Sequence, residues 1–362
     1  MESLLYIMHI DWGWIKQRPH FLAEELSKSF DVTVYHEKLY HAGKQKENQH
    51  DLPHLSLHDL WHIPMRRLKP IFNLNRFVMN HILLRKELKR CPLLWLCHPM
   101  HYSGHKRKGQ FLIYDCMDDV LEFKCSPAIR QQQEKLEAAL CRDADLVLAS
   151  SDYLKKKLET RYGTTNIKVV NNAISLNIEE IQPLPTAIDQ LFQSSRKKMV
   201  YIGTISSWFN FDLLIKILNQ NPNLELILFG PTEVTIPDHP QIKYAGVAEH
   251  KYVSSIMSKA DALIMPFVVN ELIKSVNPVK AYEYIYAHKP VLMPFYEEVD
   301  KFKEYIYLYH NEEEATQLLN RLANGELAPK ASLENSQQFA LKNNWKNRAA
   351  FIVEEIRKAR GK

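Results

Sequence analysis

Short apolar runs alternate with longer amphipathic stretches along the chain, and the pattern occurs twice. The first set predicts strands over Leu4–Ile10, Val32–His36, Leu93–His98, Phe111–Asp115, Leu146–Ser150 and Ile167–Val170. The second predicts them over Met199–Gly203, Leu224–Phe229, Ile242–Ala245, Ala262–Pro266, Pro290–Met293 and Tyr305–Leu308. Strands that are apolar throughout and separated by helices indicate parallel sheets covered on both faces. The sequence therefore predicts an α/β protein with two doubly wound, Rossmann-like domains.

The intervening stretches have the spacing of helices. In the first half they are Arg18–Phe30, Ile71–Arg90, Ala128–Arg142 and Asp152–Tyr162, and in the second half Asp212–Asn219, Tyr252–Lys259, Val279–Ala287 and Glu312–Asn324. A polar stretch with two prolines separates the two sets. We expect an N-terminal domain over 1–178, a linker over 179–198, a C-terminal domain over 199–344 and a final helix over 345–362.

Composition narrows the class of protein. The chain of 362 residues is 46% hydrophobic and 25% charged, as in soluble globular proteins. It has no apolar run of eighteen residues and no basic start typical of a signal peptide. Five cysteines without a C-x-x-C spacing favour a reducing cytoplasm over a disulfide framework or a zinc site.

Basic residues concentrate in residues 65–90. Eight lysines and arginines stand there against one glutamate, within an apolar-rich predicted helix. Such a helix suits an anionic membrane surface, and the alternative is a core helix with a solvated basic face. No recognition motif supports nucleic-acid binding.

The chemistry concentrates after predicted strands, where doubly wound domains bind ligands. The motif Asn277-Pro278-Val279-Lys280-Ala281-Tyr282-Glu283 follows a buried strand and opens a helix. A glutamate there can accept two ribose hydroxyls, and Lys280 with the helix start can hold a diphosphate. The simpler interpretation is a surface Lys–Glu pair worth tenths of a kcal/mol.

Motifs along most of the chain resemble the bacterial glycosyltransferases of family 4, in the branch that builds capsules, O-antigens, exopolysaccharides and teichuronic acids. The matching segments are 14–23, 94–99, 114–119, 144–151, 201–205, 229–231 and 266–291. The resemblance implies the GT-B fold, with two domains facing across a cleft and C-terminal helices that return toward the N-terminal domain. It implies a retaining, metal-independent hexosyl transferase (EC 2.4) and no cofactor. The substrate would be a nucleotide-sugar, with a UDP-sugar or a GDP-sugar as the first candidates. Transfer would be to a lipid-linked glycan at the cytoplasmic face of the cell membrane, with the enzyme held there peripherally.

The resemblance also assigns residues. Glu283 would bind the ribose. The earlier glutamate of the family pattern is Ser275 here, so Glu271 or backbone amides would reach the sugar. The loop after the first strand of the second domain has no cation, so Lys280, or else Arg18, would neutralise the diphosphate. Gly203 would allow close backbone approach, and Thr204 and Ser206 could donate hydrogen bonds.

The remaining predicted site residues lie in the first half. His98 would face the donor sugar, or else cap its strand. Asp118 is expected to be catalytic, and Asp115 and Asp119 to bind the acceptor. All three acids could bind acceptor hydroxyls, serve as a base or pair with Arg18. Two residues complete the predicted acceptor site, Trp14 by stacking on a sugar and His20 beside it.

Two other functions use the same fold. A degenerate, non-catalytic transferase could serve as a partner or scaffold, and a sugar-nucleotide 2-epimerase would convert the donor without an acceptor. Histidines recur at His54, His58 and His62 and again at His98, His101 and His105. No acidic partner completes either set, so no metal is expected.

Overall fold

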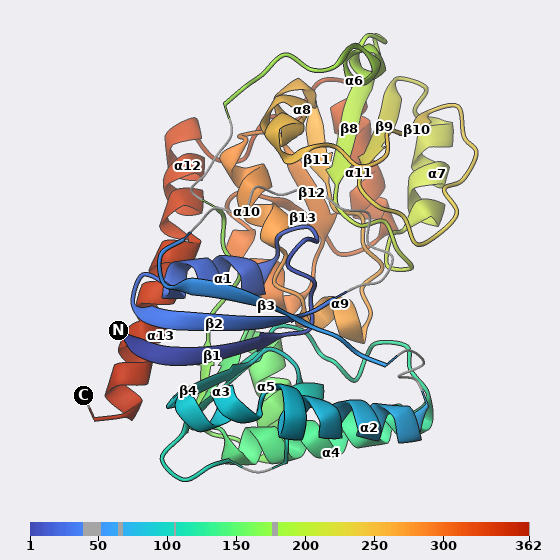
Figure 1. Cartoon of the computed structure of the whole chain (residues 1–362). Coiled ribbons are helices and arrows are strands. Elements are labelled where there is room, and N and C mark those ends of the chain that lie inside the picture. The colour runs from blue at the N-terminus through green and yellow to red at the C-terminus, as the bar shows by residue number, and fades with distance from the viewer. Residues whose placement is uncertain (39–51, 64–67, 105, 176–179, 362) are drawn as a thin grey trace. The chain divides into compact units, whose positions relative to one another are not determined.

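The computed structural model describes residues 1–38, 52–63, 68–104, 106–175 and 180–361. It divides the chain into two compact units (Figure 1). Unit 1 comprises Met1–Asn172 together with Trp345–Lys362, and unit 2 comprises Ala173–Asn344. The expected linker, 179–198, falls in unit 2. It includes α6 (Thr186–Asp189) and a 3₁₀ turn over Gln190–Phe192.

Unit 1 is built on a seven-stranded parallel sheet with the order β3-β2-β1-β4-β5-β6-β7. The strands are β1 (Glu2–Met8), β2 (Phe30–Glu37), β3 (Leu55–Leu60), β4 (Leu93–Leu96), β5 (Phe111–Cys116), β6 (Leu146–Ala149) and β7 (Ile167–Val169). Its helices are α1 (Arg18–Leu26), α2 (Lys69–Val78), α3 (Arg85–Arg90), α4 (Pro127–Asp143), α5 (Asp152–Tyr162) and α13 (Trp345–Ala359).

Both faces of this sheet are buried, which is why residues 4–8 of β1 and all of β4 are apolar. On one face, strand residues such as Leu5 and Leu94 pack with α4 and α5 in one cluster. On the other face Tyr6 stacks on Trp95, with ring centroids 5.2 Å apart. Helices α1 and α13 lie together beside the sheet in Figure 1, and the Phe21 and Trp345 rings stack between them at 5.4 Å. The last helix therefore completes the unit that the first strand begins.

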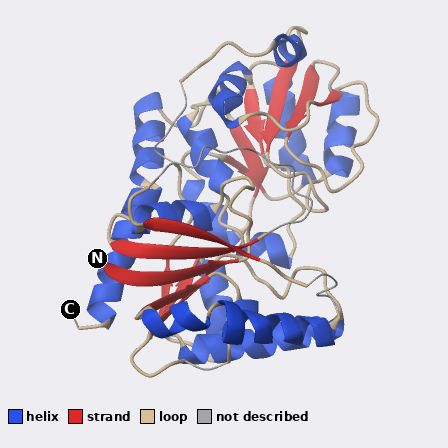
Figure 2. Cartoon of the chain, in the orientation of Figure 1, coloured by secondary structure: helices blue, strands red, loops and turns tan. Residues whose placement is uncertain are grey.

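Unit 2 contains a six-stranded parallel sheet with the order β10-β9-β8-β11-β12-β13. Its strands are β8 (Lys197–Ile202), β9 (Leu224–Phe229), β10 (Ile242–Tyr244), β11 (Ala262–Ile264), β12 (Val291–Pro294) and β13 (Tyr307–Tyr309). Its helices include α7 (Phe211–Gln220), α8 (Val253–Lys259), α9 (Glu271–Ser275), α10 (Val279–Tyr286), α11 (Glu312–Ala323) and α12 (Leu333–Lys342). Figure 2 shows each sheet with helices along its faces.

The two sheets share one topology. In each, the first strand of the unit lies in the middle and the order reverses beside it, between β1 and β4 and between β8 and β11. Ligands of open parallel sheets bind at the carboxyl ends of the strands on either side of such a switch point. The fold thus marks one candidate binding position in each unit.

Three of the differences from the sequence prediction concern β3, α9 and the helix after β3. The edge strand β3 was not predicted, because one of its faces is exposed and its polar residues interrupt the apolar pattern. The five-residue helix α9 is too short to show a period. The helix expected over Ile71–Arg90 is interrupted by a π-helical turn at Met79–Leu83. No described helix is long and apolar enough to cross a membrane.

Candidate active site

The switch point of unit 1 carries two histidines. His9 follows β1 and His98 follows β4, and because these strands are neighbours the two imidazole rings lie 4.9 Å apart. The sequence prediction included His98 and missed His9. The sequence signal for His9 was the same as that for His98, namely a histidine at the end of an apolar strand.

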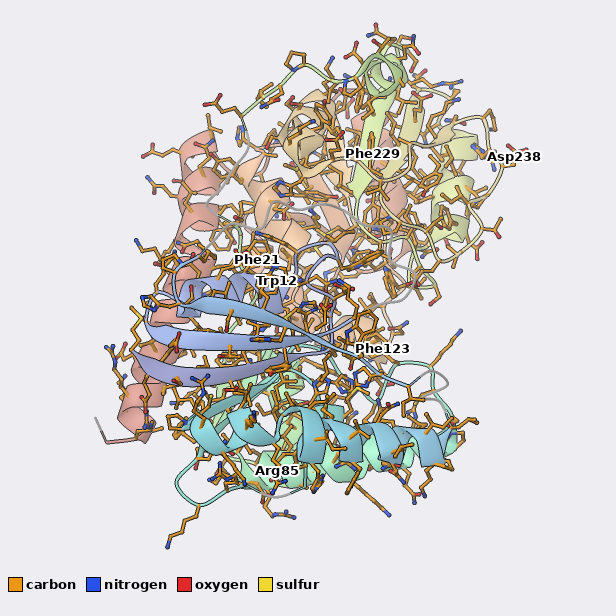
Figure 3. The ribbon with its side chains drawn as sticks, in the orientation of Figure 1. Trp12, Phe21, Arg85, Phe123, Phe229 and Asp238 are labelled. Carbon is orange, nitrogen blue, oxygen red and sulfur yellow. The ribbon has the colours of Figure 1, made fainter. Side chains whose placement is uncertain are left out.

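A pocket of about 220 Å³ opens beside these histidines. It is lined by His9, Cys97, His98, Tyr114, Met117, Asp118, Val120, Phe123 and Gln133. Phe123, labelled in Figure 3, is 45% exposed at this pocket. Side chains from the ends of three neighbouring strands therefore converge where the topology places a ligand.

Asp118 is the acidic group of this pocket. Burial raises its pKa from 3.8 to about 6, the nearby Arg18 opposes that rise, and Asp115 and Asp119 add to it. No hydrogen bond or ion pair joins its carboxylate to any residue that the structure describes. A carboxylate poised near neutral pH can accept or release a proton, so of the three roles left open for these acids the role of a base is compatible with Asp118.

His98 also has a structural partner. Its Nδ1 accepts a hydrogen bond from the backbone N–H of Met100, at 3.1 Å, and thereby caps the 3₁₀ turn over Pro99–His101. This is the alternative that the sequence left open. The hydrogen bond fixes the ring, and His98 also lines the pocket, so its capping contact does not exclude contact with a ligand.

Arg18 is committed to a buried ion pair. Its Nε and Nη2 donate to Asp115 at 2.7–3.1 Å, and its Nη1 donates to the carbonyl of Val170 at 2.6 Å. Burial alone would lower the pKa of Arg18, but the Asp115 carboxylate raises it above its ordinary value. The side chains of Arg18 and Asp115 are 2% and 0% exposed. Neither side chain is placed to meet a diphosphate or an acceptor hydroxyl.

Asp119 is likewise held by cations. Arg161 donates to both of its carboxylate oxygens at 2.8 and 2.9 Å, and Lys157 Nζ lies 2.8 Å from it. Burial would raise the pKa of Asp119, but the hydrogen bonds from Arg161 and Lys157 lower it. Of the three predicted acids, only Asp118 faces the pocket.

Two residues of the predicted acceptor site lie at the start of α1. His20 is fully buried, accepts a hydrogen bond from the N–H of Gln17 through Nδ1, and contacts the carbonyl of Asp11 through Nε2. Burial lowers the pKa of His20 to about 4, so the ring is neutral at physiological pH. Its contacts make it a helix-capping residue. Trp14 precedes the helix and is partly exposed.

Two glycines lie at the carboxyl ends of neighbouring strands at the switch point of unit 2. Gly203 follows β8, Gly230 follows β9, and a Cβ on Gly230 would lie 2.1 Å from the carbonyl oxygen of Gly203. Gly230 also has a φ of +130°, which side chains rarely tolerate. The close packing of these backbones allows the loop after β8 to turn directly away from the sheet edge.

That loop holds Thr204 and Ser206. Its end is tied to the segment after β11 by hydrogen bonds from the N–H of Asn210 to Pro266 and from the N–H of Val268 to Trp208. Ser206 is buried and donates to Glu233 at 2.6 Å, so its hydroxyl supports the loop. Thr204 is more exposed, and its carbonyl accepts from Tyr201. Of the two predicted donors, Thr204 is the more accessible.

Helix α10 presents the predicted nucleotide-binding pair. Pro278 precedes the helix, where the missing N–H removes no hydrogen bond. Lys280 Nζ lies 2.6 Å from Glu283 Oε2, and the side chains are 33% and 21% exposed. The hydroxyl of Tyr284 accepts from the N–H of Ile202 at the end of β8. This contact holds the helix against the switch point.

Position 275, where the resemblance leads one to expect a glutamate, is closed to a ligand. Ser275 is fully buried and donates to the carbonyl of Leu272 at 2.7 Å. Glu271 opens α9 as an exposed residue and pairs with Lys274 at 2.8 Å. Glu271 is therefore the acid of this segment that solvent reaches.

No family model matches the chain. A curated relative is "Putative teichuronic acid biosynthesis glycosyltransferase TuaH" of Bacillus subtilis (strain 168), 26% identical over 221 residues. The match covers 55% of this chain and 54% of the relative, so the chain spans about half the length of the curated relative.

Solved structures match over nearly the whole chain. Sucrose-phosphate synthase from Thermosynechococcus elongatus superimposes with a TM-score of 0.75 at 15% identity, covering 99% of both chains. Anabaena HepE in complex with UDP and glucose gives 0.69 at 16% identity, covering 98% of this chain and 99% of the other. A UDP-forming α,α-trehalose-phosphate synthase from Burkholderia vietnamiensis gives 0.67 at 12% identity, covering all of both. The fold prediction is confirmed: the chain has the two-domain α/β fold of the GT-B glycosyltransferases.

Proposed function

We propose that the chain is a glycosyltransferase that moves a sugar from a UDP-sugar to a glycan acceptor in cell-surface polysaccharide synthesis. The observation that carries the proposal is the Lys280–Glu283 pair, on a helix anchored at the switch point of unit 2 by Tyr284. Support comes from the UDP in the matching HepE structure and from the named activity of the Bacillus relative.

The pair can rearrange when a nucleotide arrives. An exposed ion pair is worth only about 0–1 kcal/mol, so its opening costs little. Glu283 can then accept two ribose hydroxyls, while Lys280 and the start of α10 face the diphosphate. Because Arg18 is buried against Asp115, Lys280 is the cation we assign to the leaving group.

The pocket of unit 1 supplies the second part of the proposal. We assign Asp118, His98 and His9 to contact with the reacting sugars, because they line one pocket at the carboxyl ends of neighbouring strands. With retention of configuration, the departing diphosphate takes the acceptor proton. Asp118 and His98 then position the sugars and stabilise charge rather than acting as an essential strong base.

The exposed face of α2 and the π-helical turn suits a membrane surface, where a lipid-linked acceptor would be located. Large apolar side chains are exposed there beside basic ones. They are Leu68, Leu74, Phe77, Ile82 and Leu83, at 44–62%, with Lys69, Arg85, Lys86 and Lys89 also exposed. Arg85 is labelled in Figure 3. Solvated core helices rarely expose so much apolar surface, and the charge complements anionic lipid. Residues 65–67 of the predicted membrane helix lie outside the described residues.

The decisive experiment measures UDP binding by calorimetry in the wild type and in Glu283→Gln. Loss of charge-assisted hydrogen bonds of about 1.5–3 kcal/mol should weaken UDP binding roughly 13- to 160-fold. The matched control is Glu25→Gln. Glu25, near the end of α1, pairs at 2.7 Å with Lys28, three residues later in the turn after the helix, and is 22% exposed, against 21% for Glu283.

The outcomes separate the alternatives. Equal UDP affinity in Glu283→Gln and Glu25→Gln would refute the site. No binding of UDP, GDP or dTDP by the wild type would favour a non-catalytic scaffold, and conversion of a UDP-sugar without an acceptor would favour an epimerase.

A further inference from the structure

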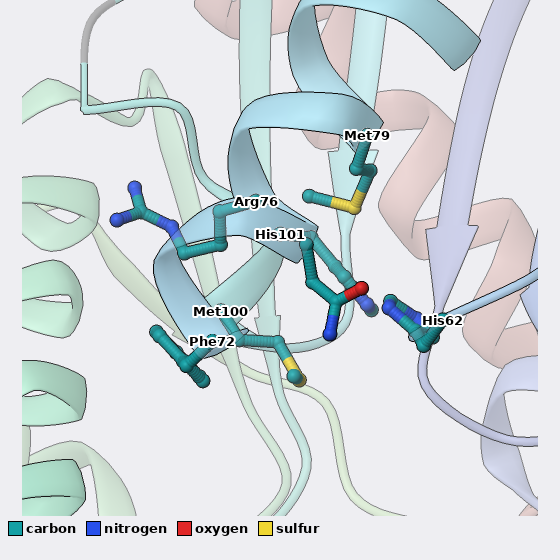
Figure 4. A pocket seen from close by; sticks show the side chains of 7 residues that line it. His62, Phe72, Arg76, Met79, Met100 and His101 are labelled. Carbon is teal, nitrogen blue, oxygen red and sulfur yellow. The ribbon is translucent and has the colours of Figure 1, made fainter. Parts of the chain in front are cut away.

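Three potential metal ligands meet at the carboxyl edge of the sheet in unit 1. Glu37 is the last residue of β2, His62 follows β3, and His101 ends the 3₁₀ turn after β4. His101 Nε2 lies 3.0 Å and His62 Nε2 3.4 Å from the same oxygen, Glu37 Oε1. One ligand atom from each residue lies within 4.8 Å of both others. Figure 4 shows the His62 and His101 rings directed toward one another.

These distances suit a small tetrahedral ion. Bonds of about 2.0–2.1 Å to nitrogen and oxygen place neighbouring ligand atoms roughly 3.4 Å apart. The two distances to Glu37 are near that value, and the third pair of ligand atoms lies within 4.8 Å. A cavity of about 10 Å³ beside both histidines has room for one small ion or water molecule.

Burial favours a cation at this cluster. The side chains of Glu37, His101 and His62 are 2%, 0% and 11% exposed. A carboxylate removed from water is costly unless positive charge or hydrogen bonds compensate it. A divalent ion supplies that charge and leaves both imidazoles neutral.

Surrounding contacts hold the ligands in place. Asn75 of α2 accepts from the N–H of Ile63 at 2.7 Å and donates to its carbonyl at 3.0 Å, which fixes the residue next to His62. The N–H of His101 bonds the carbonyl of His98 at 3.2 Å. Such support around a donor set is what an ordered metal site requires.

We propose that Glu37, His62 and His101 bind a zinc ion, with water at the fourth position. Two imidazoles and a carboxylate are a donor set that zinc accepts readily. The ion would tie β2, β3 and the segment after β4 together and stabilise unit 1. No acidic partner was expected for either histidine series. The fold supplies one, because Glu37, which lies outside both series in the sequence, is brought beside one histidine from each.

The test uses the full chain, treated with EDTA and dialysed. Calorimetry with zinc chloride should show one equivalent bound, and a hundredfold excess over Kd should raise Tm by about 5–10 °C. Cobalt(II) should give the intense visible bands of a tetrahedral site. His101→Gln and His62→Gln should weaken zinc binding at least tenfold. His58→Gln, an exposed member of the same histidine series, should not.

His62→Gln keeps the test decisive if the buried His101→Gln fails to fold. Absence of zinc binding by the wild type, or equal affinity in His62→Gln and His58→Gln, would overturn the proposal. UDP affinity should be the same with zinc or EDTA. Failure of the zinc site and failure of the nucleotide site are therefore distinguishable.

Discussion

Replacing Arg18 by methionine should destabilise unit 1 while leaving nucleotide binding intact. The guanidinium donates three hydrogen bonds to Asp115 and one to Val170, and both charged side chains are almost fully buried. Removing one partner of a buried ion pair costs about 3–5 kcal/mol, because the other charge is left without compensation. We expect Arg18→Met to lower the free energy of unfolding by that amount.

Urea denaturation followed by tryptophan fluorescence measures this loss. Five of the six tryptophans lie in unit 1, so the signal reports mainly on the unit that the substitution perturbs. Asp115→Asn should cost a similar amount, and the double variant less than the sum by at least about 2 kcal/mol, since the two residues interact. Arg142→Met is the control. Arg142 pairs with Asp143 at 2.8 Å but is 69% exposed, so its loss should cost less than about 1 kcal/mol.

The same variant tests the assignment of the diphosphate cation. If Arg18 is structural, the UDP affinity of folded Arg18→Met should stay within threefold of the wild type. An unchanged unfolding curve together with a tenfold weaker UDP affinity would refute the reasoning. That result would indicate that Arg18 binds the diphosphate.

Three further outcomes follow from the structure. The pKa of Asp118 is raised from 3.8 to about 6, so its ionisation opposes folding as pH rises through that range. Asp118→Asn should therefore be about 1–3 kcal/mol more stable than the wild type at pH 7.5, and this difference should fall below about 1 kcal/mol at pH 4, by urea denaturation. Gly230→Ala must relieve both a positive φ and a clash with Gly203. It should cost about 3 kcal/mol or more and weaken UDP binding, and a neutral result would contradict the close packing. Phe77→Ser with Ile82→Ser should reduce binding to phosphatidylglycerol vesicles at least tenfold in co-sedimentation, without changing UDP affinity.

The two sheets were predictable because their central strands are buried on both faces. Leu93–Leu96 and residues 226–229 are apolar without interruption, and the helices between strands fix the parallel direction. The edge strand β3 carries the alternation of a half-exposed surface in only six residues. A pattern so short does not distinguish a strand from a loop.

The ion pairs could not be predicted from local sequence patterns, because they join residues that are far apart along the chain. The sequence showed three acids after one strand, yet which of them meets a cation depends on packing. Asp115 meets Arg18 from a helix 97 residues away, and Asp119 meets Arg161 from a helix 42 residues away. Asp118 meets neither of these cations and lines the pocket. The same holds for Glu37, which lies 64 residues from His101.

The return of α13 to unit 1 affects the order in which the protein can fold during synthesis. Unit 2 is one contiguous segment, and its ends lie together, since the N–H of Ile174 bonds the carbonyl of Asn343. Unit 1 is discontinuous, and α1 lacks its partner until Trp345 and the residues after it leave the ribosome. The second unit can therefore finish folding first. The first unit must wait with part of its apolar surface uncovered, which makes a stalled or truncated chain the form most prone to aggregate.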